Sequence, residues 1–420
     1  MTRLLLSLYA AGLWFAVPAS AAPAKPDANA KPSGFKPSRD DVVRLQIYLD
    51  EQNFGPGRID GGYGGFTKKS WMRYQESRGE TPREEFDAAR FTSVDPTYTT
   101  YTVAAEDLAA IGTIPGKLAE QAKTKALPYT SLSELIGERY HVGVDFLKKL
   151  NAPKNVDQLK EGEQVKVPNI VPPFNLAQVF ALRQYTGERE KIIKANAEAA
   201  KKDRAEQPKP DASPAPAANA TAAAIPEAIP GPTVALSAAP PPPEAVPSPS
   251  PTAAPLPDTS PSPAPEEARK APDNRPVLTA VPANSSRLVF HVNTKESYLE
   301  VRDGERLVAC FPITPGSASI PTPKGNWKVV AKTLLPQFRW DKSVLLYGKR
   351  SGTAYELPPG PNNPVGITWI ALDRPGIGMH GTSDPDSIGR SASHGCIRLS
   401  NWDAFKVYGM VARGTQVIIE

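Results

Sequence analysis

Cysteine and histidine are both scarce in this 420-residue chain, which has two cysteines and four histidines. A large chain stabilised by disulfides would normally carry more cysteine, so at most one disulfide, between Cys310 and Cys396, can form. Cys310 lies in an apolar, alternating stretch, which predicts a buried and unpaired thiol. Cys396 lies in a loop of serine, histidine and glycine, where a thiol has other uses.

A dense block of lysine or arginine is also missing. The net charge of +5 is spread along the chain, which argues against nucleic acid as a partner. A weakly basic balance is compatible with an anionic polymer, but also with many other partners.

No apolar run reaches the roughly 20 residues that a membrane-spanning helix needs. The longest begins near the N-terminus, where Arg3 precedes the apolar stretch 4–17 and Ala19-Ser20-Ala21 supplies small residues. This pattern predicts a signal peptide over residues 1–21, with an uncleaved N-terminal anchor as the alternative. We therefore expect an exported protein of the periplasm or cell wall, without a membrane span after cleavage.

Proline, in contrast, is abundant, and about twenty of the 47 prolines fall between residues 205 and 280. Such a composition cannot bury a core, so it predicts a disordered Pro/Ala-rich linker. Fully stretched as polyproline II it would reach roughly 200 Å. The linker would either tether a searching domain or act as a passive spacer, and it makes the chain multidomain.

Residues 38–90 predict a small all-α module. Ser38-Arg39-Asp40-Asp41 has the form of a capping box that opens a helix. The glycine-rich loop 54–64 follows, and Thr67 is the expected N-cap of a second helix.

The same stretch resembles the three-helix type of peptidoglycan-binding module. The resemblance is carried by these residues: Leu45-Gln46, Gly57-Arg58-Ile59-Asp60-Gly61, Tyr63-Gly64, Thr67 and Tyr74-Gln75, where the family has Phe in place of Tyr74. It implies peptidoglycan as a partner. The alternative is that these residues only shape a tight turn between two helices.

Residues 98–172 predict an α+β region. Two amphipathic helices around 132–140 and 144–150 precede a turn and strand over 159–168, and Tyr101-Thr102-Val103 is a candidate first strand. The ending resembles a LysM repeat, a glycan-binding fold of two helices and two strands. The step of about 25 residues between the first strand and the helices is much longer than in that family.

Residues 286–420 predict a mainly-β domain with one short helix at 402–410. Alternating apolar residues mark several short strands, and Asp303-Gly304 is a strong hairpin signal. Many short strands with few helices predict a β-sandwich or an irregular barrel.

Cys396 and His380 are the candidate catalytic pair of this domain, since they lie 16 positions apart in sequence, in segments of unusual composition. A nucleophilic cysteine needs a nearby imidazole to take its proton. It also needs backbone N–H groups for a developing oxyanion. Gly395 permits close approach to the backbone, so the N–H groups of Gly395 and Cys396 are the expected donors.

Met379-His380-Gly381-Thr382 and Ser393-His394-Gly395-Cys396-Ile397-Arg398 resemble the L,D-transpeptidase catalytic domain of the YkuD type. Flanking stretches agree with the resemblance, namely Pro321-Thr322-Pro323-Lys324-Gly325 and Pro361-Asn362-Asn363-Pro364-Val365-Gly366.

The resemblance implies a role for each residue of the two segments. Cys396 would be the acyl-accepting nucleophile and His380 its general base, oriented by the carbonyl of Gly381. Ser393 and His394 would shape the turn, and Gly395 would line the oxyanion hole. Arg398 would brace the loop or contact a substrate carboxylate.

The implied reaction is cysteine acyl transfer from a stem tetrapeptide, with release of D-Ala and formation of a peptidoglycan cross-link. It needs no cofactor, because the thioester retains the energy of the cleaved amide. A hydrolase or L,D-carboxypeptidase acting through the same thioester is one alternative. A wall-binding scaffold with a vestigial catalytic domain is the other.

The histidines allow two further interpretations. Cys396, His394 and His380 contain zinc-type donors, but no fourth ligand lies at finger spacing, so we expect no metal. His141 and His291 are expected to be packed or exposed rather than catalytic.

Overall fold

The computed structural model describes residues 35–188, 287–341, 354–390 and 393–420, together with Lys191, Glu198 and Ser343. The predicted signal peptide at 1–21 and the predicted linker at 205–280 lie outside the described residues. The described parts of residues 39–420 belong to one compact unit. No helix in the described part of the chain is both long and apolar enough to cross a membrane.

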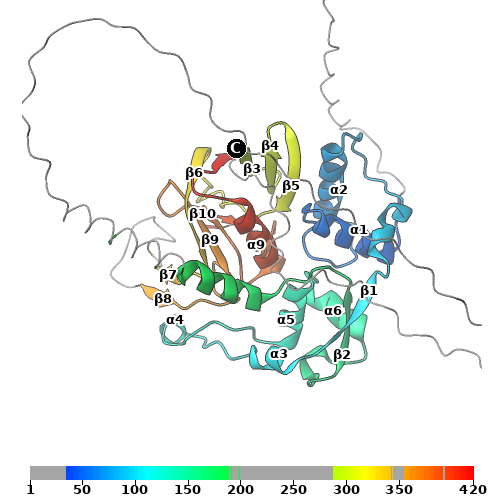
Figure 1. Cartoon of the computed structure of the whole chain (residues 1–420), viewed down its shortest axis with the longest axis horizontal. Coiled ribbons are helices and arrows are strands. Elements are labelled where there is room, and N and C mark those ends of the chain that lie inside the picture. The colour runs from blue at the N-terminus through cyan, green and yellow to red at the C-terminus, as the bar shows by residue number, and fades with distance from the viewer. Residues whose placement is uncertain are drawn as a thin grey trace, which may run out of the picture. The chain divides into compact units, whose positions relative to one another are not determined.

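An N-terminal helical region is present, as predicted. Helices α1 (Arg39–Glu51) and α2 (Gly65–Ser77), shown in Figure 1, pack with the 3-10 helix η1 (Ala88–Val94). Buried aromatic side chains such as Trp71 and Phe91 fill their core. The prediction that Thr67 caps the second helix is wrong. The helix begins two residues earlier, and the buried Thr67 hydroxyl instead contacts Gln46 at 3.1 Å.

The second region pairs its first and last strands. Strand β1 (Tyr98–Thr102) is antiparallel to β2 (Gln164–Pro168), with Tyr98 opposite Pro168. The helices between these strands are α3 (Ala105–Ala109), α4 (Leu118–Gln121), α5 (Leu132–Arg139), α6 (Val144–Asn151) and the 3-10 helix η2 (Val156–Gln158). The predicted strands and helix pair are found near the expected positions, and the LysM-like assignment stays a prediction.

The C-terminal region is a β-rich domain, as predicted. Its main sheet has eight strands in the order β11-β10-β9-β6-β12-β3-β4-β5. The strands of the region are β3 (Leu288–Asn293), β4 (Tyr298–Asp303), β5 (Arg306–Pro312), β6 (Gly325–Leu334), β7 (Phe338–Trp340), β8 (Tyr355–Leu357), β9 (Thr368–Leu372), β10 (Gly378–His380), β11 (Ile397–Arg398) and β12 (Gln416–Ile419), with the 3-10 helix η4 (Pro385–Ser387) and helix α9 (Asn401–Met410). Strands β7 and β8 form a separate two-stranded sheet.

The sheet curls so that its two ends meet. Beyond β5, the backbone N–H of Thr314 donates to Arg398 in β11 at 2.8 Å, and the Arg398 N–H returns a bond of 3.0 Å. Helix α9 lies against the sheet (Figure 1). One apolar core includes the buried residues Phe290, Ile370 and Trp402. The arrangement is a partly closed barrel, the irregular alternative among the two folds expected.

A helix over residues 176–188 was not predicted from the sequence. Phe174, just before it, and Val179 within it join the apolar core of the catalytic region. The Phe174 ring lies edge-on to Phe405 of α9, with 5.9 Å between centroids. This segment follows β2 directly and so attaches the second region to the core of the C-terminal one.

The N-terminal loop covers the free edge of β5. Gly55 donates to the carbonyl of Cys310 at 2.7 Å, and the Cys310 N–H donates to Asn53 at 2.9 Å. Pairing of this kind satisfies backbone groups that an edge strand would otherwise expose. Cys310 is a buried free cysteine, as predicted, and burial raises the pKa of its thiol well above the usual value.

Candidate active site

Strand pairing brings the two candidate catalytic residues together. His380 is the last residue of β10, and Cys396 immediately precedes β11. These strands are parallel, with Met379 opposite Ile397 and His380 opposite Arg398. In this register Cys396 falls beside Gly378, two residues before His380 along β10, and both candidate residues line one cavity.

The imidazole of His380 is held in one orientation. Its Nδ1 donates to the carbonyl of Gly381 at 2.6 Å, which assigns the other ring nitrogen, Nε2, as the acceptor. The Trp369 ring stacks on it, with centroids 5.6 Å apart and planes inclined by 21°. Burial lowers the pKa of His380 to about 4, with the Arg398 charge acting in the same direction. The ring is therefore neutral at neutral pH.

Cys396 is half-buried, and its thiol donates to the carbonyl of Gly376 at 3.4 Å. Burial raises the thiol pKa, although the Gly378 backbone and the Arg398 charge oppose this effect. Both shifts favour the uncharged forms of the two groups.

The turn before Cys396 is fastened on two sides. The Ser393 hydroxyl donates to the Cys396 carbonyl at 2.5 Å, and the Ser393 backbone bonds to Pro315 and Ser317 at 2.9 Å each. Gly395 has φ +99°, a conformation that favours glycine. His394 is exposed at the cavity wall. The positions of Ser393 and Gly395 are those of residues that shape the turn.

Arg398 also lines the cavity. One of its terminal nitrogens, Nη1, lies 3.4 Å from the Ser387 hydroxyl, and its buried Nε has no hydrogen-bond partner among the described residues. An arginine stays protonated in proteins. It therefore places a positive charge in the cavity beside the thiol, with donor capacity to spare.

The cavity has a volume of about 610 Å³ and an aromatic wall that the sequence did not predict as part of the site. Phe338 and Trp340 of β7 form this wall, and Pro364 and Val365 line the cavity beside Trp369. The sequence pattern around these residues predicts only a strand or a loop. Their place beside the candidate catalytic strands depends on how the two-stranded β7–β8 sheet packs in the folded chain.

The other two histidines lie elsewhere. The Nδ1 of His141 is 2.9 Å from Asp50, and its ring stacks on Trp402 with centroids 5.0 Å apart. His291 lies in β3 opposite Glu300. Neither residue lines the cavity that contains Cys396 and His380.

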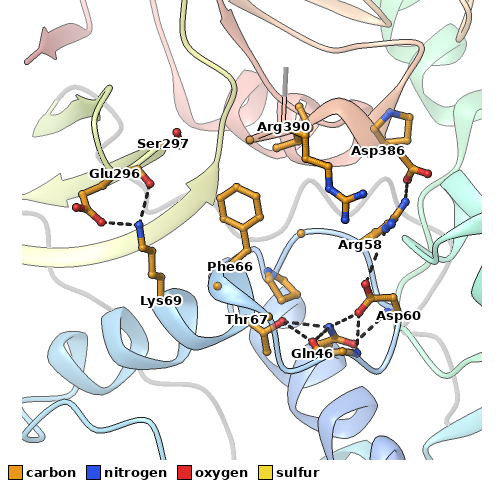
Figure 2. Close-up of a pocket in the computed structure, with 18 of the residues that line it drawn as sticks. Gln46, Arg58, Asp60, Phe66, Thr67, Lys69, Glu296, Ser297, Asp386 and Arg390 are labelled. Carbon is orange, nitrogen blue, oxygen red and sulfur yellow. Dashed lines mark hydrogen bonds and ion pairs between the residues drawn. The ribbon is translucent and has the colours of Figure 1, made fainter. Parts of the chain in front are cut away.

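A second cavity, of about 420 Å³, lies at the N-terminal glycine loop and is shown in Figure 2. Gln46 organises this loop, because its amide oxygen accepts from the N–H groups of Asp60 and Gly61 at 3.1 and 3.0 Å. Its amide nitrogen contacts Asp60 and Thr67. Arg58 pairs with Asp386 across the cavity. The motif residues thus have a clear structural task in shaping the loop.

Comparison with known proteins places the resemblance in the C-terminal region. Residues 287–419 match the YkuD family, described as the L,D-transpeptidase catalytic domain. The Bacillus licheniformis YkuD protein, which carries an L,D-transpeptidase name, is 31% identical over 133 residues, covering 32% of this chain and 64% of that protein. Bacillus subtilis YqjB, named likewise, is 29% identical over 133 residues, covering 30% of this chain and 68% of that protein.

A solved structure titled L,D-transpeptidase from Mycobacterium smegmatis matches with 24% identity and a TM-score of 0.27. The match covers 32% of this chain and 58% of that one. The chain spans less than two thirds of the Bacillus licheniformis relative, and each of these matches covers about a third of the chain or less.

Proposed function

From the YkuD-type L,D-transpeptidase catalytic domain at residues 287–419, we propose that the whole protein forms peptidoglycan cross-links by cysteine acyl transfer. The donor is a stem tetrapeptide whose terminal D-Ala is released. The observation that carries the proposal is the pairing of β10 with β11, which sets His380 and Cys396 on one cavity.

Acylation begins when the neutral imidazole of His380 accepts the proton of the Cys396 thiol through Nε2. The sulfur attacks the carbonyl between the L-centre of the diamino acid and D-Ala, and the N–H groups of Gly395 and Cys396 receive the oxyanion. The C–N bond then breaks, and the imidazolium returns the proton to the leaving amine of D-Ala. A thioester on Cys396 remains.

In the second step, the acyl group is transferred from Cys396 to the acceptor amine. The amine of a neighbouring stem peptide attacks the thioester, gives a proton to His380 and displaces the thiolate, which is reprotonated. The aromatic wall of Phe338 and Trp340 would keep water away from the thioester, which favours amine over water as acceptor. Arg398, with its unpaired Nε, suits a carboxylate of the substrate.

The predicted export and the two N-terminal regions fit this activity. A wall enzyme must act outside the cytoplasm, and modules that hold glycan would keep the catalytic domain near its polymer. We propose the periplasm or cell wall as its location and peptidoglycan as its partner, with residues 38–90 and 98–172 as candidate contacts.

Purified disaccharide-tetrapeptide, incubated with the protein and analysed by mass spectrometry, tests the proposal. Dimers that have lost D-Ala are the expected product, and Cys396→Ala abolishes them while the buried-thiol control Cys310→Ala retains them. Tripeptide monomers without dimers would instead establish the hydrolase alternative. Undiminished dimer formation by Cys396→Ala would refute the cysteine mechanism.

A further inference from the structure

Asn401, the first residue of α9, is fully buried and uses its whole side-chain amide. Its Oδ1 accepts from the backbone N–H groups of Ile367 and Thr382, at 3.2 Å each. Its Nδ2 donates to Glu138 Oε2 at 2.8 Å and to the Pro361 carbonyl at 3.3 Å. The amide therefore links the segment before β9, the segment after β10 and a residue of the second region.

Two glycines press directly against this amide. A Cβ placed on Gly381 would lie 2.2 Å from Asn401 Oδ1, and one on Gly366 would lie 2.0 Å from it. Gly381 supplies the carbonyl that orients His380. Any displacement of the Asn401 amide is therefore passed to the backbone that sets the direction of the imidazole.

Glu138 of α5 holds the other side of Asn401. Its side chain is buried, and its second oxygen, Oε1, accepts from the Tyr129 hydroxyl at 2.7 Å. Both oxygens of the Glu138 carboxyl group are thus hydrogen-bonded, which an apolar residue could not achieve, and burial raises the pKa of this group to about 7. This residue lies 263 positions before Asn401 in the sequence.

The long segment between β1 and α5, which distinguishes this region from the LysM family, also contacts the C-terminal region. Leu127 in this segment donates its N–H to the Pro359 carbonyl at 3.0 Å and accepts from Asn362 at 3.2 Å. A Cβ on Gly360 would lie 2.1 Å from the Leu127 carbonyl oxygen. The segment therefore fastens the loop that ends in Pro364 and Val365, two residues of the catalytic cavity.

We propose that Glu138 is a positioning residue for catalysis, acting through Asn401 on the Gly381 backbone that orients His380. The second region is then a structural part of the active site, in addition to any role in binding glycan. This inference rests on the roles proposed above for Cys396 and His380.

A reciprocal exchange tests the contact in the full-length protein. Asn401→Asp keeps the acceptor oxygen but replaces the donor with a second carboxylate facing Glu138. We expect the alkylation rate of Cys396 by iodoacetamide and kcat for dimer formation to fall at least about tenfold, with KM nearly unchanged. Adding Glu138→Gln restores both rates, since the introduced amide donates to the introduced carboxylate and its oxygen still accepts from Tyr129.

Asp107→Asn is the matched control, because it neutralises another buried carboxylate of the same region whose partners, Ala104, Tyr101 and Arg139, all lie within that region. It should leave the alkylation rate and kcat as in the wild type. A folded Asn401→Asp variant with wild-type rates, or a double variant no faster than Asn401→Asp, would overturn the inference.

If Asn401→Asp does not fold, Glu138→Met alone decides. Its thioether replaces both oxygens that accept from Asn401 and Tyr129, so alkylation must slow, and an unchanged rate overturns the inference. Alkylation needs no peptidoglycan, so a wild type that alkylates normally but forms no dimers would contradict the proposed function and leave the positioning result intact.

Discussion

The Nδ1 of His380 lies 2.6 Å from the carbonyl oxygen of Gly381, the next residue in the chain. This contact selects the tautomer whose Nε2 carries no proton, the nitrogen that acts as the base in the proposed mechanism. The ring is also buried beneath Trp369, which holds its pKa far below the usual 6.5. The imidazole of His380 therefore stays neutral over an unusually wide pH range.

The acid limit of catalysis should lie near pH 4. The folded-state pKa of His380 is lowered, so the imidazole stays neutral down to about pH 4 and is protonated below that value. We expect the part of the fall in kcat/KM that comes from His380 to begin only there. Trp369→Ala admits water, so the limit should move up by about one to two pH units toward 6.5. Fluorescence recorded at each pH confirms folding; an identical limit in both proteins would contradict burial as the cause.

Gly366→Ala should impair catalysis more than the matched Gly304→Ala. Both glycines have φ +60°, so both changes carry a backbone penalty of about 1 kcal/mol. A Cβ at Gly304 meets open space, whereas at Gly366 it lies 2.0 Å from Asn401 Oδ1. We expect Gly304→Ala to retain dimer formation and Gly366→Ala to lose at least about tenfold in kcat. Equal activities would mean that the Asn401 amide has no part in the site.

Arg398→Gln should lower kcat/KM for the tetrapeptide by about 10- to 100-fold, the value of a charge-assisted hydrogen bond. The diagnostic measurement uses a substrate with an amidated terminal carboxyl group. For the wild type, kcat/KM should be lower with the amidated substrate than with the free acid. For Arg398→Gln, kcat/KM should be the same with both substrates. If amidation lowers both proteins equally, Arg398 braces the loop beside Ser387 instead. Arg390→Gln, in the other cavity, serves as the control.

Lys406→Met should destabilise the fold strongly. The Lys406 ammonium donates to the Asp50 carboxylate and to the Asp50 carbonyl, at 2.9 Å each, and Asp50 is only 2% exposed. Removing the cation leaves a buried charge without this partner, which costs about 3 kcal/mol or more. Lys148→Met, which breaks the exposed pair with Asp157, should cost below about 1 kcal/mol. Urea unfolding measures both, and equal losses would contradict burial as the reason.

Much of the chain could be predicted locally. Alternation in residues 288–292 and the Asp303-Gly304 turn indicated strands that are present as β3, β4 and β5. The predicted start of α2 was wrong. The Thr67 hydroxyl accepts a hydrogen bond from Gln46 on the other side of the loop and does not cap the helix. The helix at 176–188 was missed, since its apolar side packs on a domain that begins about a hundred residues later.

The sequence by itself determined which residues form the candidate catalytic pair, because Cys396 and His380 lie in two segments that resemble the L,D-transpeptidase catalytic domain. Only the tertiary structure decided that both groups favour their uncharged forms, since burial acts through space. It also decided that Glu138 reaches Asn401 across 263 positions. Hydrogen bonds of that kind leave no periodicity in the sequence, so folding alone brings their partners together.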